Sequence, residues 1–160
     1  MQAEVDSLRD SESFTVVSQA ELRKVSFSSI LPMKLVTGIK HDAATGASKH
    51  KVRAVVCGNF QPKSPNEELY AANADVTSVR AVLAEAANQK MSIKVLDVKT
   101  AFLNAHLPGS FEAILVRPPQ ALVEFGVIPP GTVWKLQKAV YGLRIAPKAW
   151  GLERDQAMRK

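Results

Sequence analysis

The chain of 160 residues contains a single cysteine, Cys57, which excludes an internal disulfide and a zinc site built from cysteines. Its three histidines are scattered, so they indicate no metal site. No apolar run approaches the roughly 20 residues that span a bilayer. Residues 1–14 are acidic and polar and lack the order of a signal peptide. We therefore expect an intracellular protein, cytoplasmic or nuclear, that has no membrane partner.

The composition that remains is that of an ordinary globular domain. Hydrophobic residues make up 46% of the chain and charged residues 22%. These values exclude wholesale disorder, collagen-like repeats and a coiled coil. The length corresponds to one domain, residues 1–160.

Positive charge is concentrated in two blocks of this +6 chain. Residues 31–66 carry six basic residues and one acidic residue, and residues 135–148 carry four basic residues and no acidic one. Such blocks fit a polyanionic partner, for example nucleic acid or nucleotide phosphates. Charge alone favours the alternative interpretation, a solvated surface that keeps the protein soluble.

The first part of the chain predicts a weak helix with a turn over 4–24, followed by a basic β-hairpin. Residues 34–40 and 51–60 form β-branched runs on either side of the turn-rich segment 41–50. The hairpin places Lys40 and Arg53 on adjacent strands. The compact charge of a lysine ammonium and the planar guanidinium of an arginine together suit a triphosphate. Lysines on edge strands that prevent aggregation give the alternative interpretation.

The second part predicts alternating helices and strands. A helix is expected over about 77–90, because apolar residues recur at helical spacing after Asp75. Strands are expected at 91–98, 111–119 and 133–140, a loop at 120–132, and a helix beginning at Pro147. A short helical turn is expected after Asp97.

Two further groups of residues suggest chemistry. Asp97 ends an apolar strand pattern, so its carboxylate either binds magnesium or caps the turn that follows. The segment 141–150, YGLRIAPKAW, places a glycine, two cations and aromatic rings at a helix start. That arrangement suits an anion and a stacked base, whereas Trp150 in an ordinary core is the alternative.

Three motifs in order resemble one family: RAVVCGNF at 53–60, LDVKTAFLN at 96–104 and YGLRIAPKAW at 141–150. The chain is similar to the copia-type retrotransposon reverse transcriptase, an RNA-dependent DNA polymerase, over about residues 4–155. The resemblance implies an α+β fold with the fingers and partial palm of a right-hand polymerase, truncated before the Asp-Asp hairpin. Residues 31–75 would form the basic fingers hairpin, and 76–160 the start of the palm and the nucleotide-supporting segment.

The resemblance also implies a Mg²⁺-dependent nucleotidyl transfer and a set of site residues. Its partners would be an RNA or DNA template-primer, deoxynucleoside triphosphates and the remainder of a polyprotein. Asp97 would be catalytic and would bind metal together with the carbonyl of Val98. The residues that would bind the nucleotide are Lys40, Arg53, Thr100, Ala101, Phe102, Gly142 and Arg144. Phe102 would select deoxynucleotides by a clash with the 2′-hydroxyl.

Departures from the family pattern lead us to expect an incomplete catalyst. The family carries a paired Asp-Asp downstream, and this sequence has no adjacent aspartates. Ile145 stands where the family has glutamine, and Ala105 where it has glycine. Two further hypotheses therefore stay open, namely a non-catalytic nucleic-acid-binding remnant and a decayed mobile-element fragment.

Overall fold

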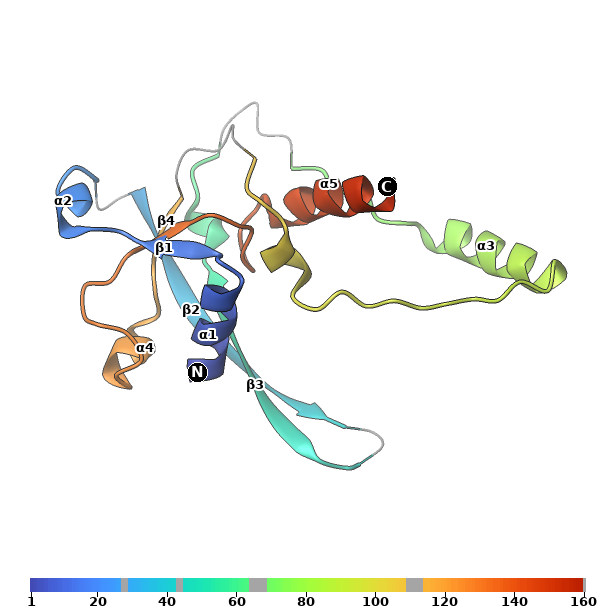
Figure 1. Ribbon diagram of the computed structural model, residues 1–160, viewed down its shortest axis with the longest axis horizontal. Coiled ribbons are helices and arrows are strands. Elements are labelled where there is room, and N and C mark those ends of the chain that lie inside the picture. The colour runs from blue at the N-terminus through green and yellow to red at the C-terminus, as the bar shows by residue number, and fades with distance from the viewer. Residues whose placement is uncertain (27–28, 43–44, 64–68, 109–113, 160) are drawn as a thin grey trace.

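The computed structural model describes residues 1–26, 29–42, 45–63, 69–108 and 114–159. Within them the fold is α+β, with a mixed five-stranded sheet in the order β1-β5-β4-β2-β3 (Figure 1). The strands are β1 (Phe14–Val16), β2 (Ile30–His41), β3 (Ser48–Val56), β4 (Leu115–Arg117) and β5 (Trp134–Leu136).

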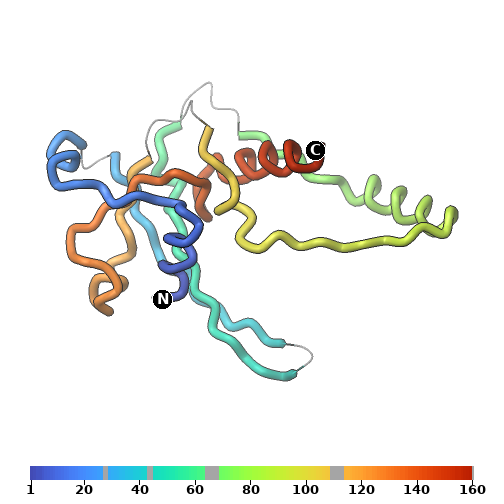
Figure 2. The backbone as a smooth tube through the Cα atoms, in the orientation of Figure 1, coloured from blue at the N-terminus to red at the C-terminus, as the bar shows by residue number. Residues whose placement is uncertain are grey.

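The long strand β2 joins two parts of the structure. Its first residues, Ile30 to Pro32, pair in parallel with β4 inside the sheet. From Met33 onward it pairs with β3 in an antiparallel hairpin, which projects from the body of the molecule (Figures 1 and 2). The predicted basic hairpin is confirmed, and β-branched residues in both strands favour its extended conformation.

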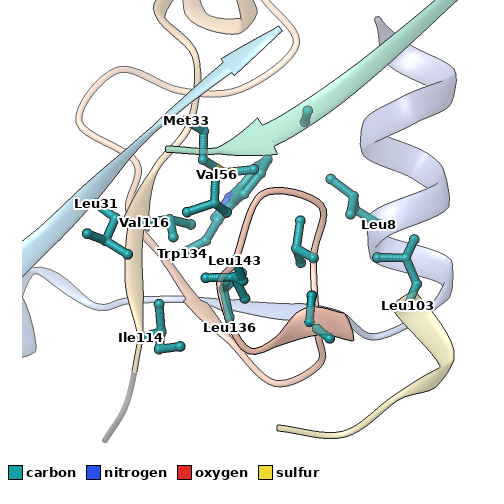
Figure 3. Packing of buried hydrophobic residues seen from close by; sticks show 14 of the residues in the cluster. Leu8, Leu31, Met33, Val56, Leu103, Ile114, Val116, Trp134, Leu136 and Leu143 are labelled. Carbon is teal, nitrogen blue, oxygen red and sulfur yellow. The ribbon is translucent and has the colours of Figure 1, made fainter. Parts of the chain in front are cut away.

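The core lies where the sheet meets the segments that follow β5. Trp134 is fully buried, and its ring stacks on Phe14 with 4.1 Å between the centroids. Met33 and Val56 from the base of the hairpin lie beside this tryptophan, and Leu31 from the first part of β2 belongs to the same cluster (Figure 3). The base of the hairpin is therefore fixed by packing, while its far end is exposed.

The N-terminal segment contains more structure than its sequence predicts. Helix α1 (Gln2–Asp10) buries Val5 and Leu8, and the short helix α2 (Gln19–Leu22) follows β1. The prediction of one helix and a turn missed β1, because three residues carry no alternation that sequence reading can detect. Their strand conformation comes from pairing with β5, which only the fold provides.

The helix predicted near 77–90 is confirmed as α3 (Val76–Asn88). The Asp75 carboxylate accepts hydrogen bonds from the backbone N–H groups of Thr77, at 2.7 Å, and Ser78, at 3.1 Å. These bonds and one from the Ser78 hydroxyl hold the pKa of Asp75 below its ordinary value, with the hydroxyl contributing most. The cap thus fixes where the helix begins.

Most of the apolar face of α3 is exposed in the described part of the chain. Val79, Val82 and Leu83 are exposed, and Ala86 is the residue of α3 that is buried. In Figure 1 the helix lies away from the body, and residues 91–98 run from its far end back toward the body. The periodicity correctly predicts the helix but does not reveal what covers it.

The strand predicted over 91–98 is wrong, because these residues form no strand in the structure. Val95 and Leu96 are about nine-tenths exposed, at 92% and 89%. A strand exists only through hydrogen bonds to a neighbouring strand, and no described segment pairs with this one. Apolar residues do alternate over 91–98, but this alternation does not specify a neighbouring strand that would pair with them.

Two smaller expectations also need correction. The predicted loop over 120–132 contains the helix α4 (Gln120–Glu124), whose Leu122 is buried in the core. The predicted strand over 133–140 is confined to β5, and beyond it Lys138 forms only an isolated β-bridge with His106. The strand predicted over 111–119 is represented by β4, and residues 111–113 lie outside the described part of the chain.

The last helix matches its prediction. It is α5 (Ala146–Met158), and Pro147 occupies its first turn, where the missing N–H costs no hydrogen bond. Trp150 is half-buried and packs against the main core, which supports the core interpretation of this residue. None of the helices in the described ranges is long and apolar enough to cross a membrane.

Candidate nucleotide and nucleic-acid site

The hairpin presents one strongly basic face. Its register pairs Lys40 with Lys49, Gly38 with Lys51 and Val36 with Arg53. Because side chains alternate along a strand, paired residues and their second neighbours share a face. The basic face therefore consists of Lys34, Lys40, Lys49, Lys51 and Arg53, and neither β2 nor β3 contains an acidic residue.

The register separates the two cations that the sequence assigns to one triphosphate. Lys40 lies across from Lys49, whereas Arg53 lies four residues farther along β3. At a rise of about 3.3 Å per residue, their backbones are roughly 13 Å apart along the hairpin. Lys40 and Arg53 share a face without being neighbours, and Arg53 is the one at the base, next to the core.

A backbone clasp joins the end of β3 to the segment at 141–142, far away in sequence. The N–H of Val56 donates to the carbonyl of Tyr141 at 2.8 Å. Gly142 has a φ of +89°, and a Cβ on it would overlap the carbonyl oxygen of Val56. A Cβ on Gly58 would likewise overlap the carbonyl of Gly142. Glycine at both positions permits this approach.

Arg144 extends the clasp to the loop after β3. Its Nη1 donates to the carbonyl oxygens of Pro62, at 3.2 Å, and Gln61, at 3.4 Å. In this structure the guanidinium thus ties the two chain segments together. Arg144 and Gly142, both predicted to support a nucleotide, lie together at the base of the hairpin.

Tyr141 brings Arg53 and Phe102 into one cluster. The guanidinium carbon of Arg53 lies 5.3 Å from the centroid of the Tyr141 ring. The Phe102 ring meets the same tyrosine edge to face, with 5.2 Å between centroids and 65° between planes. Arg53 and Phe102, which are both predicted to bind the nucleotide, therefore contact the same side chain, that of Tyr141.

The predicted phosphate-binding amides lie at the start of a short 3₁₀-helix, η3 (Ala101–Asn104). Thr100 precedes it in a left-handed conformation, with φ of 49° and ψ of 42°. The Asn104 side chain donates to the Lys99 carbonyl at 3.1 Å and fixes this turn. The helical turn expected after Asp97 is confirmed, and Leu103 anchors it in the core.

Asp97 lies on the exposed segment 91–98, directly before this turn. It does not cap the turn, since Thr100 occupies the N-cap position. Within the described residues, no three His, Cys, Asp or Glu side chains gather into a possible metal site. Mg²⁺ requires near-octahedral oxygen ligation, so Asp97 and the Val98 carbonyl alone do not fit the ion.

The cluster and the clasp include residues whose part the sequence did not reveal. Tyr141 was considered as a platform for a base, but its contacts with Arg53 and Phe102 could not be foreseen. Gly58 was read as the end of a strand, whereas it also makes room for Gly142. A glycine at the end of a predicted strand is the available signal for such an approach.

Comparison with known proteins identifies the family. The family model described as reverse transcriptase (RNA-dependent DNA polymerase) matches residues 11–160. The chain is 31% identical, over 99% of its length, to the retrovirus-related Pol polyprotein from transposon TNT 1-94 of Nicotiana tabacum. It is 33% identical, over 71% of its length, to the Pol polyprotein from transposon RE1 of Arabidopsis thaliana.

This chain belongs to the reverse transcriptase family of copia-type retrotransposons, as its three motifs predicted. It spans 11% of the tobacco relative and 8% of the Arabidopsis relative. No solved structure matches it significantly. The family is therefore established from sequence, whereas the activity of the whole polyprotein is a separate matter.

Proposed function

We propose that this chain holds the incoming nucleotide and the nucleic-acid strand for RNA-directed DNA synthesis within a copia-type Pol polyprotein. The hairpin and its flanks, about 31–75, act as the fingers of a right-hand polymerase, and about 76–160 begin the palm. The observation that carries the proposal is the basic face of the hairpin, whose base adjoins the cluster of Arg53, Tyr141 and Phe102.

The spacing of the basic face supports a phosphate backbone as its ligand. Lys49, Lys51 and Arg53 alternate along one strand, so successive cations are roughly 7 Å apart. The four lysines of the face are exposed, and Arg53 is half-buried at the base. A single strand can follow this row, while the triphosphate of a nucleotide binds at the Arg53 end.

Catalysis in this proposal requires Mg²⁺, which supplies charge stabilisation for the transferred phosphoryl group. Asp97 contributes one carboxylate from this chain, and further ligands come from another part of the polyprotein. The exposure of segment 91–98 supports this division, because a metal-binding side chain must be held in place by neighbouring groups. The chain by itself is accordingly catalytically incomplete.

Salt dependence of binding tests the proposal. If the four exposed lysines contact phosphates of single-stranded RNA, log K should fall with log salt at a slope of about −2.8, that is about −0.7 per contact. Lys51→Gln should reduce the slope by about 0.7. Lys24→Gln, which removes an exposed lysine outside the hairpin, is the matched control.

The result that rejects this proposal is a slope near zero, or equal slopes for the Lys51→Gln and Lys24→Gln variants. A non-catalytic nucleic-acid-binding protein is the second candidate, favoured by the missing metal cluster among the described residues. That candidate predicts the same salt slope. It differs in that joining the chain to the rest of the polymerase region yields no DNA synthesis.

A further inference from the structure

Arg53 lies half-buried at the base of the hairpin without a carboxylate partner in the described part of the chain. Burying a guanidinium without compensation is costly. The group that faces it is the Tyr141 ring, 5.3 Å away. An aromatic face attracts a cation through its quadrupole and leaves the positive charge unneutralised. Arg53 thus keeps its full charge for an anion from outside.

The tyrosine ring is itself held in place from two sides. Its backbone carbonyl accepts the Val56 N–H at 2.8 Å, and the close approach of Gly142 to Val56 permits this bond. The Phe102 ring packs edge to face against the Tyr141 ring. Aromatic pairs of this geometry are favourable beyond the apolar area that they bury. The orientation of the ring is therefore determined by the fold.

We propose that Tyr141 is a positioning residue, which orients Arg53 toward the phosphates of the incoming nucleotide. The inference rests on the proposed function and assigns a role within the same site. Tyr141 acts through Arg53, because the ring aligns the guanidinium in its ordered geometry before the ligand arrives. Preorganisation of this kind increases affinity by removing the cost of ordering the side chain upon binding.

The test is an NMR titration of the 160-residue chain with deoxyadenosine triphosphate, with Arg53 and Tyr141 varied singly and together. Tyr141→Leu should weaken binding by about 3- to 10-fold, the range that a cation–π contact covers. Tyr141→Phe keeps the ring and should bind within about 2-fold of wild type. Tyr70→Leu, at the 76% exposed second tyrosine, is the matched control.

A double-mutant cycle separates positioning from a merely structural role. Arg53→Gln should weaken binding, and adding Tyr141→Leu to it should cause no further loss. If Tyr141→Leu does not fold, a trifluorinated phenylalanine at 141 preserves the shape and weakens the ring face electrostatically. It should bind more weakly than the Tyr141→Phe variant, whereas equal binding would overturn the inference.

The outcomes distinguish this inference from the proposed function. If wild type does not bind deoxyadenosine triphosphate, both fail together. If Arg53→Gln weakens binding but Tyr141→Leu does not, the nucleotide site stands and the positioning role is refuted. The role is also refuted if the effects of Arg53→Gln and Tyr141→Leu add independently, or if Tyr141→Phe weakens binding as much as Tyr141→Leu.

Discussion

Replacing Gly142 by alanine should be among the most damaging small substitutions in this chain. The left-handed backbone of Gly142, with φ of +89°, costs an alanine about 1–2 kcal/mol by itself. The new Cβ would also overlap the Val56 carbonyl and lie 2.6 Å from Cγ1 of Val55. Relieving that overlap separates the two segments and breaks the 2.8 Å bond from the Val56 N–H to Tyr141.

The magnitude follows from adding these effects. Val56 is buried, with 2% of its surface exposed, so an unpaired N–H there costs about 1–3 kcal/mol. Together with the conformational cost, Gly142→Ala should lower the free energy of unfolding by about 2–5 kcal/mol. The assay is equilibrium unfolding in urea, followed by tryptophan fluorescence, since Trp134 lies in the core.

Gly126→Ala is the matched control. Gly126 also has a positive φ, of +68°, but no atom lies within 4 Å of the position that a Cβ would take. This variant should therefore show the conformational cost of about 1–2 kcal/mol alone. If the two variants lose the same stability, the clasp between β3 and segment 141–142 does not contribute and the reasoning is refuted.

Three further predictions concern α1 and α3. Glu4→Ala should lower the free energy of unfolding by about 1–3 kcal/mol, because Oε1 of Glu4 accepts a hydrogen bond from the part-buried Ala54 N–H at 2.9 Å. Urea unfolding measures this change. An equal loss of stability in Glu4→Gln, which keeps an acceptor, would contradict the prediction. The Asp75 cap should stabilise the start of α3 fully above pH 3.8, and this stabilisation should be lost as the pH falls through the lowered pKa of Asp75. Amide NMR shifts of the first turn of α3 should follow this titration in the wild type and should be insensitive to pH in Asp75→Asn. Equal responses of the two proteins would refute the cap. Val82→Ala, at a site 68% exposed, should change the free energy of unfolding by less than about 0.5 kcal/mol. Val116→Ala, at a fully buried site, should lower it by about 2 kcal/mol. Thermal unfolding compares the two variants, and similar losses of stability would show that α3 is packed.

Local patterns were sufficient for those elements whose stability is itself local. The hairpin of β2 and β3 follows from two runs with β-branched residues on either side of a turn-rich segment, and α3 follows from its Asp75 cap and helical spacing. The segment 91–98 has an equally clear pattern but no strand beside it. Its conformation depends on a distant partner, which periodicity cannot supply.

The site divides in the same way. Apart from Lys40, its predicted residues lie in the three motifs, and the register shows that Lys40 and Arg53 share one face. The contacts of Tyr141 could not be predicted, because they join positions 53, 102 and 141 through the tertiary fold. The separation of roughly 13 Å between Lys40 and Arg53 likewise required the pairing register.

Primer extension on an RNA template, with Mg²⁺ and deoxynucleoside triphosphates, tests the central claim most directly. The chain should be compared alone and joined to the rest of the polymerase region, each with Asp97→Asn and with Asp10→Asn as an exposed control. We expect no extension by the chain alone, extension by the joined protein, and loss of that extension in Asp97→Asn only. Extension by the chain alone, or full activity of the joined Asp97→Asn protein, would contradict the central claim.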